Sequence, residues 1–429
     1  MKQISSIRYT GIRQFFLFGL TALFLSMLTV LVLQQCDGIT GFRDRLVFFA
    51  AVMVLDGVFL TVCSIYSWRT GASFIPLICA ITVLIGISAS YLLLFNSFMK
   101  QMCLMVLGMA IGIAVFYTWR RKNLLTDRGF RKLIIAIVVL LVVNVVFGQE
   151  ENGARLRIDL FGLFTFQPGE VVKVLLVLLG ACSYGNQQRS ILYCLAALGS
   201  CVVLLLLRDM GGAVVIFAMF VLMTYLLFDN RILSLTIIGL ALVGFICLIK
   251  VSPYAANRLD AWTRVMEKEN TWQQRNFIKA VLYGGFRGLG VHNAFMSGLD
   301  LENAGMLVDI YAISSDGALA GIMAVYGVPM VFLAVGAYTV LILQPVYNRS
   351  VYPSNFLITT QTSMLLFCQV VLNFCGSLDL LPFTGLAVPL LSQGGTAVLT
   401  FAAMMGLEAA ALHPALHMDK NKEVALHAR

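Results

Sequence analysis

The residues of this chain that could do chemistry gather in one stretch, residues 251–317, which holds two Trp, a cluster of Arg and Lys, a Gly-rich turn and several acids. Asp309 and Asp316 lie seven positions apart, so on one helix they would share a face. A carboxylate there can act as a general base, and the guanidinium forks of Arg275 and Arg287 suit phosphate oxygens. We therefore expect part of an active site here. The alternatives are that the cations attract anionic lipid and that the Trp residues anchor the stretch at the headgroup layer.

Two further polar sites lie at the ends of apolar stretches. Glu170 and Lys173 are three positions apart, on one face of the helix expected from residue 169 onward. Ionisable residues inside a membrane span are costly, so a functional role is expected, although a self-neutralising pair at the membrane boundary also fits. Asp209 lies in a very short turn, where it can cap the following helix, and capping does not exclude a role in a site.

Pro and Gly are concentrated near the end of the chain. Such a density breaks a membrane span, and irregular backbone at membrane depth is tolerated where it lines a cavity or is buried in protein. Freed N–H groups there would bind phosphate oxygens, whereas the alternative is a kinked packing helix. The residues concerned are Asn373, Pro382, Thr384, Gly385, Ser392, Gly394, Gly395 and Thr396.

Composition excludes a soluble fold. Of the 429 residues, 60% are hydrophobic and 12% are charged, with a mean hydropathy of +0.89, whereas soluble domains carry about 25% charged residues. We predict an all-α, polytopic integral membrane protein with about twelve transmembrane helices and one long extracytoplasmic loop. The apolar stretches lie near 14–34, 45–66, 74–95, 101–118, 131–148, 169–185, 190–207, 211–228, 232–250, 318–343, 356–375 and 386–412.

Basic residues predict the orientation, because the cytoplasmic loops of membrane proteins are enriched in Lys and Arg. The strongest signal, between the fourth and fifth stretches, consists of Arg120, Arg121, Lys122, Arg128, Arg131 and Lys132. Both termini are therefore expected in the cytoplasm and residues 251–317 outside it. The sequence has no basic stripe interleaved with aromatics, which argues against nucleic acid, and its ten Cys show no metal-ligand spacing, so no metal site is expected.

The chain divides by these features into five parts. Residues 1–150 hold the first five helices, residues 151–250 the next four, and residues 251–317 the extracytoplasmic loop with the expected catalytic Asp. Residues 318–412 hold the last helices with the Pro- and Gly-rich re-entrant segment, and residues 413–429 form a cytoplasmic tail.

Four motifs in sequence order resemble the SEDS family of cell-wall polymerases, the FtsW, RodA and SpoVE group. The family's FQPSE motif and following Lys resemble Phe166–Glu170 with Lys173, and its PDLGT turn resembles Asp209–Gly212, with Arg208 in place of the Pro. Its outer loop, with a Trp, a Tyr-Gln pair and a Gly-rich turn, resembles Trp262, Trp272-Gln273 and Gly284–Gly290. Its late signature resembles Asn373, Pro382, Thr384-Gly385, Pro389 and Ser392–Thr396, with Gln393 in place of a Tyr. Five helices rather than three precede Phe166, so two N-terminal helices are additional.

The resemblance implies a peptidoglycan glycosyltransferase in the cytoplasmic membrane of a bacterium, polymerising lipid II for cell elongation, division or sporulation. It implies as partners a class B penicillin-binding transpeptidase and other elongation or division proteins, and it leaves open whether a divalent cation, Mg²⁺ or Mn²⁺, takes part. Among the site residues it implies substrate contacts for Trp272 and Gln273 as well as for the late signature. The alternatives are a flippase or transporter of lipid-linked precursors, and a catalytically silent scaffold of a cell-wall complex.

The position of the catalytic acid is the open point of this resemblance. The family's catalytic Asp follows its outer loop, and Asp309 is the obvious counterpart. An ungapped count from the Gly-rich turn, or backward from Gly321, instead aligns Leu307 with the family's catalytic Asp. The same count aligns Asp316 with the second residue of the family's Glu pair. Asp309 and Asp316 are both retained as catalytic candidates.

Overall fold

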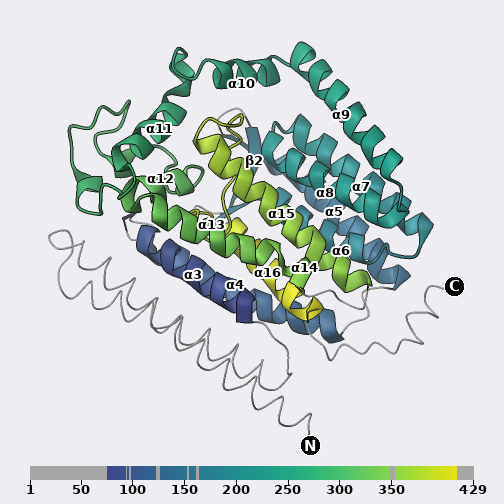
Figure 1. Ribbon diagram of the computed structural model, residues 1–429. Helices are drawn as coiled ribbons and strands as arrows, with labels where there is room; N and C mark the ends of the chain where they lie inside the picture. Colours follow the sequence, from purple (N-terminus) through teal and green to yellow (C-terminus); the bar gives the residue numbers. More distant parts are fainter. Residues whose placement is uncertain are drawn as a thin grey trace, which may run out of the picture.

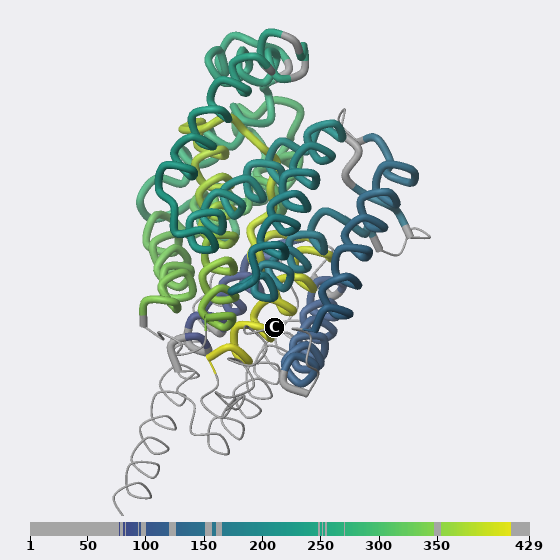
Figure 2. Tube along the Cα trace, turned by 90° about the vertical axis from the view of Figure 1, so that its right-hand side faces the viewer, coloured from purple at the N-terminus to yellow at the C-terminus, as the bar shows by residue number. Residues whose placement is uncertain are grey.

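The computed structural model describes residues 75–92, 94–95, 98–121, 126–151, 154–160, 164–347 and 353–412. These residues form a bundle of helices that lie side by side, with a polar segment folded across one end (Figures 1 and 2). The helices expected near 14–34 and 45–66, and the tail from residue 413, lie outside the described residues.

The first seven helices of the described part follow the expected apolar stretches closely. Their order is α3 (Ile75–Leu92), α4 (Phe98–Arg121), α5 (Asp127–Phe147), α6 (Pro168–Ala181), α7 (Gln187–Leu206), α8 (Met210–Phe228) and α9 (Arg231–Val251). Among the described residues, α4, α5, α7, α8 and the later α15 (Pro353–Ser377) are long and apolar enough to cross a membrane. Apolar side chains on the outward faces of α5, α7 and α9 are exposed, as expected where lipid replaces water as the surrounding solvent.

The last part of the chain departs from the sequence-based expectation. The stretch 318–343 is two helices, α12 (Ala318–Tyr326) and α13 (Val328–Ile342), followed by the short α14 (Gln344–Tyr347). Gly327 separates them with a φ of 81°, and an added Cβ there would clash with the backbone of Arg287 and Gly288. The stretch 386–412 is helical only from α16 (Gly395–Ala411), and residues 378–394 form no regular helix.

A small antiparallel sheet, which the sequence analysis did not anticipate, lies between α5 and α6. Its strands are β1 (Gln149–Glu151), β2 (Ala154–Leu160) and β3 (Phe164–Phe166), in the order β1-β2-β3. The last residue of β3, Phe166, pairs with Ile158 of β2, and α6 begins two residues later at Pro168. The sheet therefore leads directly into α6.

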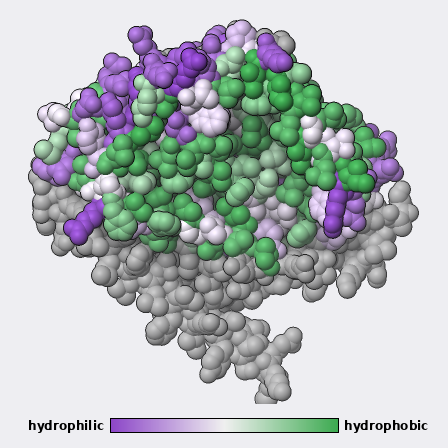
Figure 3. Space-filling view, turned by 45° about the horizontal axis from the view of Figure 1, so that its top comes forward, coloured by the Kyte–Doolittle hydropathy of each residue, from purple (hydrophilic) through white to green (hydrophobic). Residues whose placement is uncertain are grey.

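Residues 252–317, the cap segment, cover one end of the bundle. The segment contains α10 (Pro253–Thr263), η1 (Glu269–Thr271), α11 (Trp272–Gly284), η2 (Asn293–Phe295) and η3 (Leu307–Asp309). Hydrophilic residues gather along the upper margin of the face seen in Figure 3, above a largely hydrophobic body. Helix α10 of the cap contacts residues 378–394 through hydrogen bonds from Trp262 Nε1 to the Asp379 carbonyl (3.0 Å) and from Arg258 Nη1 to the Phe383 carbonyl (2.7 Å).

Helices α4 and α16 approach each other closely through small residues. An added Cβ on Gly108 would lie 3.2 Å from the Cβ of Ala402, and one on Gly112 would lie 2.7 Å from the Ala402 carbonyl oxygen. At Gly406 an added Cβ would meet the Gly112 carbonyl oxygen even more closely. Small residues of this kind let membrane helices pack backbone against backbone.

We predict that Gly406→Ala destabilises the protein, because its methyl group must push the two helix backbones apart, at a cost of about 1–3 kcal/mol. Gly199→Ala is the matched control, since Gly199 also lies within a helix and nothing is within 4 Å of its added Cβ. Thermal unfolding in detergent measures both. Equal melting temperatures for the two variants would contradict the close packing of α4 and α16.

Candidate functional site

A cavity of about 420 Å³ opens where the cap segment meets the bundle. Its walls come from the first residues of α4, α6 and α16, from Asn144 near the end of α5, from β2 and β3, and from two irregular segments, 311–316 and 384–394. Of the site residues expected from the sequence, those lining it are Glu170, Asp209, Asp316, Thr384, Gly385, Gly394, Gly395 and Thr396. The structure therefore brings together residues of the Phe166–Glu170 motif, the Asp209 turn and the late signature. The Trp residues and the Gly-rich turn of the loop do not line the cavity.

A charged cluster forms the floor of the cavity at the starts of α6 and α8. Lys173 is 2% exposed, and its Nζ pairs with Glu170 Oε1 at 2.6 Å. Asp209 caps α8, accepting a hydrogen bond from the Gly212 amide at 2.7 Å. A buried lysine needs a paired carboxylate to offset its lost hydration, so the Glu170–Lys173 pair is both a structural requirement and a fixed charge distribution beside the cavity.

The two candidate acids lie in different surroundings. Asp309 is exposed outside the cavity, and its Oδ2 accepts a hydrogen bond from the Met306 amide at 3.1 Å, so it closes its own 3₁₀ turn. Leu307, which the ungapped count aligns with the family's catalytic Asp, is fully buried. Asp316 is half-buried and lines the cavity, where its Oδ2 would lie 3.3 Å from a Cβ on Gly385.

Several residues expected to bind substrate instead bind the protein's own backbone. Asn373 Nδ2 donates to the carbonyls of Asp316 and Leu386, both at 2.7 Å. Ser392 Oγ donates to the Ser315 carbonyl at 2.6 Å, and Thr396 Oγ1 donates to the Thr165 carbonyl at 3.0 Å. The Thr384 hydroxyl is buried and has no hydrogen-bond partner among the described residues, so it is available to a ligand, while Pro382 does not line the cavity.

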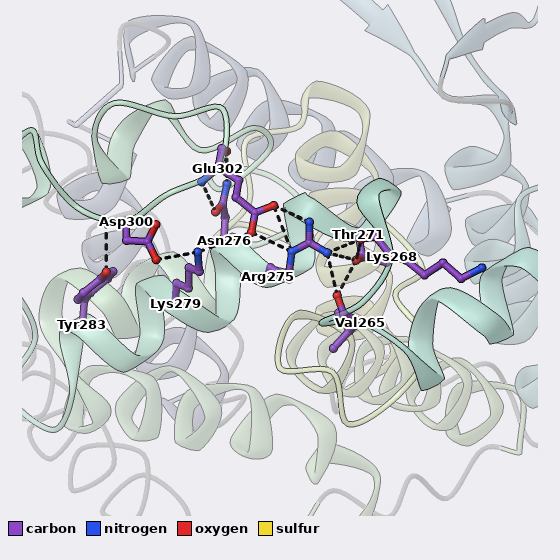
Figure 4. Close-up of polar contacts among 9 residues, drawn as sticks. All are labelled: Val265, Lys268, Thr271, Arg275, Asn276, Lys279, Tyr283, Asp300 and Glu302. Atoms are coloured by element: carbon purple, nitrogen blue, oxygen red, sulfur yellow. Dashed lines mark hydrogen bonds and ion pairs between the residues drawn. The ribbon is translucent and has the colours of Figure 1, made fainter.

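The two arginines expected to bind phosphate do not line the cavity. Arg287 is exposed. Arg275 lies on α11 in the centre of a network within the cap, where its Nε donates to Glu302 Oε1 at 2.8 Å and its Nη1 to the Val265 carbonyl at 3.1 Å (Figure 4). Lys279 adds a bond to Asp300 at 3.2 Å. These cations hold the cap together and are already engaged by the protein.

The cations that do line the cavity are Lys100, near the start of α4, and Arg157, on β2. Two amide side chains, Gln101 and Asn144, lie with them, and Asn144 Oδ1 is buried without a partner among the described residues. None of these four residues was expected at a site from the sequence. Lys100 could have been found as a cation that directly precedes an apolar helix, but Arg157 lies in the sheet that the apolar pattern did not reveal.

An aromatic pair reaches the cavity through one of its rings, since Tyr311 lines it and Trp272 and Gln273 do not. Tyr311 is 46% exposed and packs against Trp272, with ring centroids 6.1 Å apart and an interplanar angle of 55°. The neighbouring Gln273 has a buried Nε2 without a partner among the described residues. In the part of the chain that the structure describes, no group of three or more His, Cys, Asp or Glu residues is placed to hold a metal ion.

Comparisons with known proteins agree on one family. The family model described as "Cell cycle protein", FTSW_RODA_SPOVE, matches residues 72–415. A probable peptidoglycan glycosyltransferase FtsW from Halorhodospira halophila is 27% identical over 330 residues, which covers 73% of this chain and 80% of the relative. The corresponding protein of Bacillus subtilis is 24% identical over 346 residues, covering 75% of this chain and 81% of the relative.

Two solved structures have a similar fold. One comes from work on the structural coordination of polymerization and crosslinking by a peptidoglycan synthase complex, with a TM-score of 0.61, 21% identity, and coverage of 79% of this chain and 98% of that chain. The other is the rod shape determining protein RodA of Thermus thermophilus, with a TM-score of 0.53, 19% identity, and coverage of 80% and 96%.

The cap network leads to a prediction on pH. The hydrogen bond from Arg275 holds the pKa of Glu302 below its usual range. A depressed carboxylate pKa stabilises the fold above the unfolded value, about 4.3, and the contribution is lost as the pH falls through the folded value. We expect Glu302→Gln to lower the melting temperature at pH 7, by the equivalent of about 0.5–1 kcal/mol for a pair partly open to solvent.

Thermal scans from pH 7 to pH 3 test this expectation. The difference between wild type and Glu302→Gln should shrink toward zero at the acid end. Glu267→Gln is the control, because Glu267 is exposed on the same segment and no ion pair joins it to the described residues. A difference that stays constant at all pH values, or an equal effect of the control, would contradict the assigned role.

Proposed function

The chain belongs to the FtsW, RodA and SpoVE family, and from this premise we propose that it is a peptidoglycan glycosyltransferase that polymerises lipid II into glycan strands. The reaction takes place at the outer face of the cytoplasmic membrane, with both termini and the basic loops inside. The observation that carries the proposal is one cavity lined by a carboxylate from the cap, by cations from the bundle, and by the start of α16.

Asp316 is the general base in this proposal. The acceptor hydroxyl gives its proton to the Asp316 carboxylate as its oxygen bonds to the anomeric carbon of the donor, and the bond from that carbon to the lipid pyrophosphate breaks. A base must come within hydrogen-bond reach of the proton that it removes. Asp316 meets this condition for a substrate in the cavity, whereas Asp309 is exposed outside it.

The leaving pyrophosphate binds to Lys100 and Arg157 in this proposal, in place of the two loop arginines. Both cations line the cavity. The residues at the start of α16, Gly394 to Thr396, line it as well, and the first amide N–H groups of a helix have no partner within the helix and attract anions. Positive groups placed where negative charge develops lower the barrier of the transfer step.

The sugar rings are bound beside Tyr311. Tyr311 lines the cavity together with Asp316 and packs against Trp272, and such rings present flat apolar faces with polar tips. The unpartnered Gln273 nitrogen and the Thr384 hydroxyl supply hydrogen bonds of the kind that sugar hydroxyls accept and donate. This side of the cavity therefore suits the disaccharide part of the substrate.

A class B penicillin-binding transpeptidase is the proposed partner, together with other elongation or division proteins. One solved structure with a similar fold belongs to a peptidoglycan synthase complex, which supports this choice. The described residues offer no ready metal site, and the proposal routes no step through a metal.

Asp316→Asn should lower the rate of lipid II polymerisation by about 10²–10⁴-fold, the usual contribution of a general base. Asp309→Asn should retain activity within a few-fold, because its carboxylate only closes a turn. Gel analysis of glycan chains made by the purified protein with its co-purified transpeptidase measures both, and matching melting temperatures confirm folding. Loss of activity in Asp309→Asn alone would show that Asp309 and not Asp316 is the general base. An inactive wild type would favour a catalytically silent scaffold.

Lys100→Gln and Arg157→Gln should each lower kcat/KM for lipid II by about 10- to 100-fold, since a hydrogen bond to a charged group contributes about 1.5–3 kcal/mol. Arg287→Gln is the matched control, because Arg287 is an exposed cation of the cap that does not line the cavity. Steady-state kinetics at fixed salt concentration measure the three variants. An equal loss in the control would indicate general attraction to anionic lipid instead of a site.

A further inference from the structure

Four consecutive backbone carbonyls, from Ile313 to Asp316, are each held by a donor from another part of the fold. The Tyr91 hydroxyl, at the end of α3, donates to the Ile313 carbonyl at 2.8 Å. The Gln393 amide donates to the Ser314 carbonyl at 2.7 Å. Ser392 Oγ donates to the Ser315 carbonyl at 2.6 Å, and Asn373 Nδ2 donates to the Asp316 carbonyl at 2.7 Å; these two complete the set.

These donors are themselves fixed. Ser392 Oγ accepts a hydrogen bond from the Val388 amide at 2.8 Å while it donates to Ser315. Asn373 uses its amide nitrogen twice, since it also donates to the Leu386 carbonyl at 2.7 Å. Both side chains are buried, with exposed fractions of 1% for Ser392 and 2% for Asn373. Neither side chain lines the cavity, so a ligand there meets neither of them directly.

The segment needs such support because it is not helical. Ala312 has a φ of 57°, in the left-handed region that non-glycine residues rarely occupy. The chain turns there and enters α12 only at Ala318. The backbone around Asp316 is therefore not held by the hydrogen bonds of a helix or a sheet. The four hydrogen bonds from other parts of the fold hold it instead.

We propose that Asn373 and Ser392 are positioning residues, which hold the backbone of residues 313–316 so that the Asp316 carboxylate faces the cavity. This inference rests on the proposed function, because it assigns these residues to the base of that reaction. Under this proposal Asn373 and Ser392 hold backbone and do not contact the substrate, in contrast to the expectation from the sequence. Asn373 also ties the backbone of Asp316 to that of Leu386, a residue of the neighbouring cavity wall.

Ser392→Ala and Asn373→Ala test the proposal in the full-length protein with its transpeptidase. A displacement of about 1 Å of a reacting group can cost on the order of 10²-fold in rate. We expect kcat for lipid II polymerisation to fall by about 10- to 100-fold, with KM within about twofold of wild type. Ser392→Thr keeps the hydroxyl and should restore most of the rate.

Ser363→Ala is the matched control. Ser363 is also a buried serine in the bundle, on α15 with Asn373, and its hydroxyl has no partner among the described residues. The control should leave kcat unchanged. Hydrogen exchange of residues 311–318 should be faster in Ser392→Ala and Asn373→Ala than in the control, while melting temperatures show that all variants are folded.

The possible results separate the two claims. A raised KM with unchanged kcat would overturn the positioning role and make these residues ligand contacts, and unchanged kinetics would overturn it as well. A further test adds Ser392→Ala to Asp316→Asn: residues that act as one unit are not additive, so the second substitution should cost little. A full additional loss would contradict action through Asp316. An inactive wild type would overturn the proposed function itself.

Discussion

Backbone that leaves a helix inside a membrane bundle must find hydrogen-bond partners within the protein, and this constraint shapes the whole site. Residues 310–317 and 378–394 are both irregular, and each satisfies the other: the Gln393 amide and the Ser392 hydroxyl bond to the carbonyls of Ser314 and Ser315. The Ser88 hydroxyl holds the Leu390 carbonyl at 2.6 Å, and the Tyr338 hydroxyl holds that of Pro389. The cavity exists where these two segments and the starts of the helices leave space.

The charges of the protein divide into two sets with different roles. In the cap, Arg275 and Lys279 are engaged by Glu302 and Asp300, and the network ties α11 to the segment that precedes η3. At the cavity, Lys100 and Arg157 face a space that can hold an anion. The first set holds the cap together, and the second lines the cavity together with the carboxylates of Glu170, Asp209 and Asp316. Charge density in the sequence is therefore a poor guide to which cations line the cavity.

Apolar stretches predicted the described helices from α3 to α9 well, because a membrane span requires a long run of apolar residues. The pattern failed at Gly327, where an apolar run continues through a break in the helix. It also failed at the sheet between α5 and α6, because β2 (ARLRIDL) alternates apolar and polar residues, a strand signal that a search for long apolar runs does not detect. The family motifs located most of the cavity wall. They could not distinguish a side chain that binds substrate from one that binds backbone, as at Asn373 and Ser392, because both roles need the same polar groups.

The different positions of Asp309 and Asp316 relative to the cavity could not be predicted from the sequence. Both acids lie in the same short stretch and both are compatible with the sequence, but a 3₁₀ turn carries Asp309 away from the cavity while the turn at Ala312 brings Asp316 into it. The two acids are only seven residues apart in the sequence, yet their different placement matters for chemistry, since a base acts only within hydrogen-bond reach.

The most direct test of this account is an experimental structure of the full-length protein with lipid II bound. The account predicts substrate density in the cavity, with the acceptor hydroxyl within hydrogen-bond distance of the Asp316 carboxylate and the pyrophosphate beside Lys100 and Arg157. Substrate bound elsewhere, with its acceptor hydroxyl against Asp309 or against no carboxylate, would contradict it.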